Sequence, residues 1–291
     1  MKELVVLSGK GGTGKTSVSG ALAYLLGKNA LLGDCDVDAS NLHLVTGAKN
    51  TISEDFFSGC IAEINNLKCT NCGRCANICR FNAIEYINNT YVINPMHCEG
   101  CGYCYEICPK EAIILNPGHT GYLKVSETRF GSTLVHASLN IGAENSGKLV
   151  SRVREKLNQI ADDSNANLII TDGSPGIGCP VIATITGASH ILIVTEPGMS
   201  ALHDMERLIK LAQAFKISVS CIINKYDIEN DLTKNIEEYL KQNNIPLWGK
   251  LPYNDVFRIA VSDLKTAPEL NHELINKEFK KIVEFVKNTL L

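Results

Sequence analysis

The chain has 291 residues, and its formal net charge of −3 lacks the basic excess that nucleic-acid binding normally requires, so we expect no nucleic-acid partner. Its hydrophobic fraction of 45% is ordinary for a globular chain, and no apolar run approaches the ~20 residues that span a bilayer. We therefore expect a cytoplasmic protein of roughly two domains, whose twelve cysteines are metal ligands or free thiols rather than disulfides.

Short apolar runs alternate with segments long enough to form helices. The first run, Glu3 to Ser8, precedes a predicted helix from Thr16 to Leu26, and a second run extends from Ala30 to Asp34. Later runs lie at 168–171, 191–195 and 217–223, with a helix predicted over 201–215. This alternation predicts an α/β fold with a doubly wound, mainly parallel sheet. The continuous apolar character of the runs indicates helices on both faces of the sheet.

A phosphate-binding loop lies between the first predicted strand and the first helix. Residues 9–16, GKGGTGKT, satisfy the pattern GxxxxGK(S/T). Backbone N–H groups of such a loop surround phosphates, and we expect Lys15 on the β- and γ-phosphates and the Thr16 hydroxyl on Mg²⁺. The predicted ATP-binding residues of the loop are Gly9, Gly11, Gly12, Thr13, Gly14, Lys15, Thr16 and Ser17.

A cysteine-rich segment interrupts this pattern. Residues 51–117 contain nine of the twelve cysteines and a repeat of about 29 residues that leads from Cys69 to Cys98. We interpret 51–117 as an inserted domain and assign 1–50 and 118–291 to a P-loop ATPase domain. Such an insertion is thermodynamically tolerable, because loop-closure entropy grows only logarithmically with length. Residues 121–140 alternate polar and apolar around Phe130-Gly131, which predicts a hairpin.

Eight of these cysteines form two runs with x2-x2-x3 spacing, the spacing of two-cluster bacterial ferredoxins. Because the fourth cysteine of each run ligates the other cluster in those proteins, we expect two 4Fe–4S clusters with exchanged ligands. The two expected ligand sets are Cys69, Cys72, Cys75 and Cys108, and Cys98, Cys101, Cys104 and Cys79. Structural zinc is the alternative, but it uses separated CxxC pairs. Arg80 follows Cys79 where the ferredoxin pattern has proline, and its charge should raise the potential of the adjacent cluster.

The additional lysine of the phosphate loop, Lys10, carries a resemblance to a family. KGGTGKT resembles the deviant Walker A motif of the MinD/ParA class of ATPases, which includes the nitrogenase iron protein and the Mrp-type iron–sulfur carriers. Residues 34–38, DCDVD, are similar to the switch I of that family, and residues 172–176, DGSPG, are similar to its Walker B and switch II. The resemblance extends to 195–204 and covers most of the chain outside the cysteine-rich segment.

The resemblance implies roles for individual residues. Lys10 would cross a homodimer interface to the partner's ATP, Asp36 would orient the attacking water with Asp38 beside it, and Asp34 and Asp172 would hold Mg²⁺ through water. The Gly176 amide would sense the γ-phosphate, and Asn224 and Pro252 would contact adenine. A cluster bridging two chains through Cys179, as in the nitrogenase iron protein, is disfavoured because no second cysteine occurs between Asn116 and Asn167.

These features predict an ATP-hydrolysing iron–sulfur protein in which a homodimer cycle controls electron transfer to an unidentified redox partner. One alternative is an iron–sulfur assembly or carrier ATPase that hands a cluster to an acceptor protein. Another is a MinD-like positioning ATPase, whose membrane contact would involve the carboxy-terminal segment KEFKKIVEFVKNTLL. We expect that segment to be a helix packed on the sheet instead, which argues against a membrane partner.

Overall fold

The computed structural model describes residues 1–143, 146–164 and 166–291. The chain divides into two compact units. The larger unit comprises Met1–Glu54, Tyr122–Leu139 and Ser146–Leu291. The second, which we call the cysteine unit, comprises Asp55–Gly121 and a short segment beginning at Asn140.

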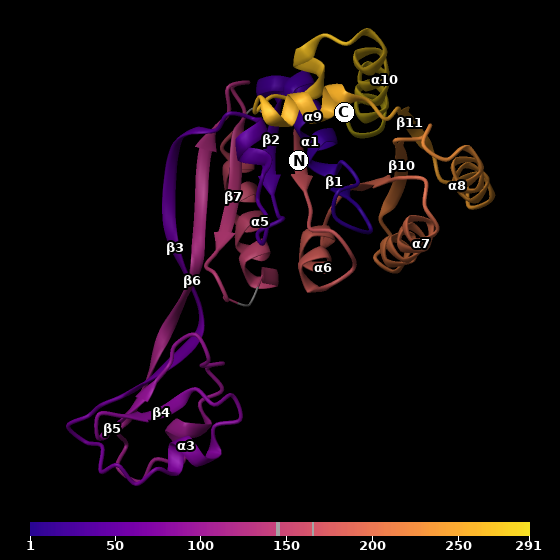
Figure 1. Ribbon diagram of the computed structural model, residues 1–291. Helices are drawn as coiled ribbons and strands as arrows, with labels where there is room; N and C mark the ends of the chain where they lie inside the picture. Colours follow the sequence, from indigo (N-terminus) through magenta and orange to yellow (C-terminus); the bar gives the residue numbers. More distant parts are fainter. Residues whose placement is uncertain (144–145, 165) are drawn as a thin grey trace. The chain divides into compact units, whose positions relative to one another are not determined.

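A nine-stranded sheet provides the framework of the larger unit, which includes β3 only up to Glu54 and β6 only from Tyr122 (Figure 1). In sheet order the strands are β11 (Leu247–Leu251), β10 (Ser218–Asn224), β9 (His190–Thr195), β1 (Lys2–Leu7), β8 (Leu168–Asp172), β2 (Ala30–Asp34), β7 (Thr133–Leu139), β6 (Ile113–Glu127) and β3 (Lys49–Ile64). Every neighbouring pair from β11 to β7 is parallel. The predicted mainly parallel sheet is therefore confirmed.

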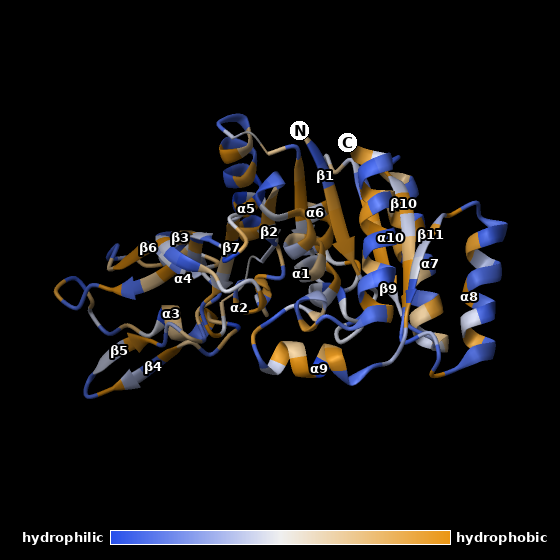
Figure 2. Cartoon of the chain, turned by 90° about the horizontal axis from the view of Figure 1, so that it is seen from above, coloured by the Kyte–Doolittle hydropathy of each residue, from blue (hydrophilic) through white to orange (hydrophobic). Residues whose placement is uncertain are grey.

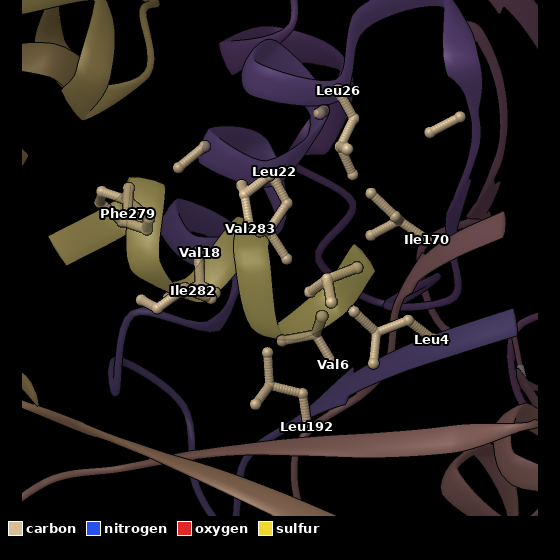
Figure 3. Close-up of a cluster of buried hydrophobic side chains, with 14 of the residues drawn as sticks. Leu4, Val6, Val18, Leu22, Leu26, Ile170, Leu192, Phe279, Ile282 and Val283 are labelled. Carbon is tan, nitrogen blue, oxygen red and sulfur yellow. The ribbon is translucent and has the colours of Figure 1, made fainter. Parts of the chain in front are cut away.

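Both faces of the sheet are covered because successive side chains of a strand point to opposite faces. In β1, Leu4 and Val6 pack with α1 (Lys15–Leu26) and α10 (Glu273–Leu290), as Figure 3 shows. Val5 and Leu7 pack on the other face, against α6 (Cys179–Ile185), α7 (Met199–Ala214) and α8 (Asn230–Gln242). Figure 2 shows the resulting hydrophobic colouring of β1 and the mixed colouring of α8 and α10.

The remaining helices of this unit are α2 (Leu42–Val45), α5 (Ser146–Asp162) and α9 (Asp255–Ser262). Strands β6 and β7 are neighbours joined by residues 128–132, where the Thr128 amide donates to the Ser132 carbonyl at 2.9 Å. The left-handed Gly131, with φ of 79°, lies in this turn. The hairpin predicted around Phe130-Gly131 is therefore confirmed.

The carboxy-terminal helix α10 uses its apolar stripe inside the protein. Ile275, Phe279, Ile282, Val286 and Leu290 are all buried. The prediction of a terminal helix packed on the sheet is confirmed, and most of its apolar surface is not accessible to lipid. Among the described residues, no helix is both long enough and apolar enough to cross a membrane.

The cysteine unit repeats one small motif. Helices α3 (Arg74–Ile78) and α4 (Tyr103–Glu106) each begin after a left-handed glycine, Gly73 or Gly102, with φ of 74° in both. Strands β4 (Ile84–Ile87) and β5 (Thr90–Ile93) pair antiparallel through a two-residue turn. Both turn residues, Asn88 and Asn89, have positive φ, as this class of tight hairpin requires.

Candidate functional site

The phosphate loop connects the end of β1 to the start of α1. Gly12 and Gly14 have φ of 80° and 95°, a conformation that other residues adopt only under strain. At Gly9 there is no room for a side chain, because a Cβ would collide with Asp204 of α7. The loop formed by these glycines leads into the amino terminus of α1, where the helix dipole favours anions. Gly11 is exposed, and Thr16 and Ser17 lie half-buried in the first turn of α1.

Lys15 and Thr16 both bind the carboxylate that ends β8. The Lys15 Nζ lies 3.2 Å from Asp172 Oδ1 and 3.4 Å from Asp36 Oδ2, and the Thr16 hydroxyl donates to Asp172 Oδ2 at 2.6 Å. The side chains of Lys15 and Asp172 are only 7% and 1% exposed. Burial lowers the pKa of Lys15, but the charges of Asp172 and Asp36 outweigh it and hold that pKa above its ordinary value. The structure thus brings four predicted site residues together.

Asp34 lies completely buried beside this group at the end of β2. Its carboxylate accepts hydrogen bonds from the Ser40 hydroxyl at 2.8 Å, the Leu42 amide at 3.0 Å and the Asp36 amide at 3.1 Å. Burial, together with the charge of Asp172, raises the pKa of Asp34 to about 7. Two carboxylates and a hydroxyl in one buried site suit Mg²⁺, which takes oxygen ligands and would relieve their repulsion.

The residues that the resemblance assigns to the switches occupy the rim of this group. Burial raises the pKa of Asp36 against the opposing charge of Lys15, and the exposed Asp38 is close enough to add a small repulsive contribution. The Gly176 amide donates to the Ser8 carbonyl at 2.9 Å, at the beginning of the phosphate loop. That amide would therefore have to leave Ser8 to bind a phosphate oxygen.

The two residues expected at adenine follow neighbouring strands. Asn224 ends β10, and its amide donates to the Thr13 carbonyl at 2.8 Å. Its Nδ2 lies so close to Gly14 that a Cβ there would collide with it. Pro252 is half-buried directly after β11. Both therefore lie at the carboxyl edge of the parallel sheet, where ligands of such folds bind.

Sequence reasoning missed one acidic residue of this site. Glu196 directly follows β9 and binds two lysines: Lys10 Nζ lies 2.9 Å from Oε1, and Lys225 Nζ lies 2.8 Å from Oε2. Lys225 Nζ also donates to the Gly12 carbonyl of the phosphate loop at 3.2 Å. Its position in the sequence could have identified Glu196, because polar residues directly after parallel strands lie at the edge of the sheet where ligands bind.

The loop, its lysines and the carboxylates at the ends of β2 and β8 form a nucleotide site. The family model described as CbiA, the CobQ/CobB/MinD/ParA nucleotide binding domain, matches residues 4–266. The chain belongs to this family. It is therefore a nucleotide-binding protein of the MinD/ParA class, as the resemblance at Lys10 implied.

Individual relatives agree with this assignment. The chain is 36% identical over 230 residues to the uncharacterized protein MJ0578 of Methanocaldococcus jannaschii, covering 78% of this chain and 79% of that protein. The septum site-determining protein MinD of Pyrococcus horikoshii, solved with Mg-ADP, superposes with a TM-score of 0.54 at 19% identity, covering 98% of this chain and 95% of that one. The structure of the MinC:MinD cell division protein complex of Aquifex aeolicus superposes with a TM-score of 0.59 at 16% identity. The match covers 99% of this chain and 96% of that one. At these identities the two structures establish the α/β P-loop fold alone.

The eight cysteines of the two runs line two cavities in the cysteine unit of this MinD/ParA-class protein. One cavity is lined by Cys69, Cys72, Cys75 and Cys108. The other is lined by Cys79, Cys98, Cys101 and Cys104. Each cavity thus receives three cysteines from one run and the fourth from the other run. The second cavity has a volume of about 350 Å³, and the first has a volume of about 20 Å³.

Backbone amides already point at several of these sulfurs. The Ala83 amide donates to Cys79 Sγ at 3.4 Å, the Ala112 amide to Cys108 Sγ at 3.3 Å and the Asn71 amide to Cys69 Sγ at 3.5 Å. Such N–H groups stabilise negative charge on sulfur, as iron–sulfur proteins require of their cysteines.

The thiols of each set also disfavour simultaneous ionisation. Burial, and then the charges of Cys98 and Cys101, raise the pKa of Cys104 to about 11, and burial raises the pKa of Cys75. A bound cationic iron core would relieve this cost. Within the described ranges, no three His, Cys, Asp or Glu side chains converge closely enough to hold a single metal ion.

The charged residues around the two cavities bear on the expectation that Arg80 raises the potential of the adjacent cluster. Arg80 lines the second cavity, but the acidic Glu99 lines it too. The first cavity is lined by two cations, Arg74 and Lys110. The positive charge of Arg80 is therefore offset by Glu99 in the second cavity. The first cavity is the one whose lining carries a net positive charge.

Proposed function

We propose that this protein is a MinD/ParA-class ATPase that hydrolyses ATP in a homodimer cycle and carries two 4Fe–4S clusters in its cysteine unit. The observation that carries the iron–sulfur part is the exchange of the fourth cysteine between the two cavities. Each cavity has three cysteines from one run and one from the other. Packing alone does not explain this arrangement, since free thiols have no reason to gather in sets of four.

The nucleotide chemistry follows from the charges of the site. Phosphoryl transfer depends mainly on positioning and on neutralising the γ-phosphate. Lys15 would exchange Asp172 for the β- and γ-phosphates, and Thr16, Asp34 and Asp172 would hold Mg²⁺. Asp36 would orient the attacking water, and Lys10 would reach the nucleotide of the second chain.

The cysteine unit would hold its clusters through the two cysteine sets, with the amides of Asn71, Ala83 and Ala112 hydrogen-bonded to sulfur. Bound 4Fe–4S clusters supply one-electron transfer over a wide range of potentials. The ATPase cycle would then alter how the protein binds a redox partner, and by reciprocity that partner would alter nucleotide affinity.

Two single variants test the ATPase part. Lys15→Ala should abolish nucleotide binding without changing the iron content of anaerobically purified protein. Lys10→Ala should bind nucleotide normally and lose hydrolysis. Normal hydrolysis by Lys10→Ala would refute the exchange of lysines between chains. Protein that remains without iron after anaerobic reconstitution with iron and sulfide would refute the cluster assignment.

A second candidate function is delivery of a cluster by an assembly or carrier ATPase. Cys72 and Cys101, one in each cavity, are exposed. An exposed ligand is accessible to the thiols of an acceptor protein, which favours clusters that can leave. Transfer of a cluster to an apo-acceptor that depends on ATP would favour this function, and clusters retained through many ATPase turnovers would favour electron transfer.

A third candidate, suggested by the MinD structures, is spatial positioning. The burial of the apolar stripe of α10 argues against a lipid-binding role for that helix. Sedimentation with anionic liposomes, with and without MgATP, tests this candidate directly. Nucleotide-dependent sedimentation would support it.

A further inference from the structure

Glu196 is the only described residue that binds both Lys10 and Lys225. Each of its carboxylate oxygens takes one lysine, at 2.9 Å for Lys10 and 2.8 Å for Lys225. Its side chain is 18% exposed, while those of Lys10 and Lys225 are 39% and 29% exposed. Burial alone would raise the pKa of Glu196, but hydrogen bonds from the two lysines lower it overall, so the group is a stable carboxylate.

The three residues meet because of the strand order. Lys10 follows β1, Glu196 follows β9 and Lys225 follows β10, and these strands are adjacent and parallel. Lys225 is the more firmly placed of the two lysines. Its own amide donates to Asn224 Oδ1 at 3.0 Å, its φ is 54°, and its Nζ also binds the Gly12 carbonyl. Within the part of the chain that the structure describes, Glu196 is the one ion-pair partner of Lys10.

The unequal anchoring of the lysines indicates which contact can be released. If Lys10 leaves, Glu196 keeps the cation of Lys225 and does not become an unpaired, largely buried charge. If Lys225 left, its contact with the phosphate loop would be lost as well. The pair Glu196–Lys225 can therefore remain in place while Lys10 moves.

We propose that Glu196 retains Lys10 within its own chain and thereby sets the protein concentration at which ATP drives dimerisation. The inference rests on the proposed function, in which Lys10 acts on the nucleotide of a second chain. In this proposal Lys10 leaves Glu196 when it reaches a phosphate of the second chain, so each dimer breaks two Lys10–Glu196 contacts. The retention opposes dimerisation and is released by it.

The magnitude follows from the exposure of Lys10. A partly exposed ion pair contributes roughly 0.2–1 kcal/mol, which corresponds to a factor of up to about five in an equilibrium constant. Because two such contacts are broken per dimer, the factor applies twice. Removing the charge of Glu196 should therefore lower the dimer dissociation constant by up to about 25-fold.

The test measures dimerisation by sedimentation velocity over a dilution series, with Mg²⁺ and a non-hydrolysable ATP analogue. Glu196→Gln, which keeps the shape and removes the charge, should dimerise at lower concentration than wild type. In a Lys10→Ala background the same substitution should have no effect on dimerisation. The matched control is Glu237→Gln, which removes an equally simple ion pair, with Lys250 at 2.8 Å, on α8 and β11. It should leave the dissociation constant unchanged.

Two further measurements separate the possible failures. MgADP affinity of Glu196→Gln, measured with a fluorescent analogue, separates a change in nucleotide binding from a change in dimerisation. Glu196→Asp reports on folding if the glutamine variant is unstable. A Glu196→Gln dissociation constant that equals or exceeds that of wild type overturns the retention role alone. Wild-type protein that binds nucleotide but never dimerises overturns the proposed homodimer cycle and, with it, the role of Glu196.

Discussion

Two glycines of one cysteine loop provide a matched test of how the second cavity is built. Gly100 and Gly102 lie in the run from Cys98 to Cys104 and have φ of 63° and 74°. Both are therefore in the left-handed region, and alanine at either position carries the same backbone cost of roughly 1–2 kcal/mol. The space available for a Cβ differs between the two positions.

A Cβ at Gly100 would lie less than 3.0 Å from the Cys60 carbonyl oxygen, and 3.1 and 3.3 Å from the carbonyl carbon and amide nitrogen of that residue. These are backbone atoms of β3, which cannot rotate away. A Cβ at Gly102 would meet only Leu115 Cδ1, at an ordinary 3.6 Å. Overpacking of this kind costs roughly 1–3 kcal/mol beyond the backbone cost. Gly100→Ala should thus destabilise the cysteine unit by about 2–5 kcal/mol and Gly102→Ala by about 1–2 kcal/mol.

The assay is iron and sulfide content after anaerobic reconstitution, followed by loss of cluster absorbance in a denaturant series. Gly100→Ala should hold about half of the wild-type iron, because the loop that carries Cys98 and Cys101 moves while the other cysteine set keeps its geometry. Gly102→Ala should retain nearly all of it and bleach at slightly lower denaturant. Equal iron content and equal bleaching midpoints in the two variants would refute the argument from Cys60.

Three further predictions concern ligand exchange, pH and potential. Cys79→Ala and Cys108→Ala should each remove about half of the iron, and the surviving cluster should differ in its electron paramagnetic resonance spectrum; identical spectra would contradict the exchanged sets. Burial lowers the pKa of His190 to about 4, below the ordinary value of 6.5, so its contribution to stability is complete above pH 6.5 and is lost as the pH falls toward 4. The loss amounts to about 3 kcal/mol of the free energy of unfolding. In His190→Phe, the free energy of urea unfolding should therefore fall by about 3 kcal/mol less between pH 6.5 and pH 4 than it does in wild type. An equal fall in the two proteins would contradict the lowered pKa of His190. Glu99→Gln should raise the potential of the cluster in the second cavity in an anaerobic redox titration, by a modest amount because the side chain is exposed, and a lowered potential would show that other charges dominate.

The parts of the site that depend on local sequence could be predicted. The phosphate loop is specified by its glycines and by Lys15, which need only a preceding strand and a following helix. The sorting of the cysteines could be predicted from their x2-x2-x3 spacing, because in two-cluster ferredoxins with that spacing the fourth cysteine of each run ligates the other cluster. The alternation of apolar runs and helical segments was sufficient for the parallel sheet.

The parts that depend on strand order could not be predicted. The meeting of Lys10, Glu196 and Lys225 requires β9 to lie between β1 and β10, and no local pattern specifies that neighbourhood. The pairing of Lys15 with Asp172 likewise joins residues 157 positions apart. The full lengths of β3 and β6, 16 and 15 residues, were also not anticipated, because their exposed segments lack a continuous apolar pattern; only the end of β6 was predicted, as one arm of the hairpin.

The charge pairing of the nucleotide site explains why magnesium and nucleotide should enter it together. Lys15 binds Asp172 and Asp36, the same carboxylates that are expected to hold the metal and to orient water. Mg²⁺ alone would displace Lys15 and leave a largely buried ammonium group without a partner, whereas a triphosphate alone would attract Lys15 and leave the carboxylates of Asp34 and Asp172 facing each other. Both outcomes cost free energy, because unpaired charges are unfavourable in a buried site. The magnesium–nucleotide complex supplies both missing partners at once, so its binding should be strongly cooperative relative to either component, and a nucleotide affinity independent of Mg²⁺ would contradict this pairing.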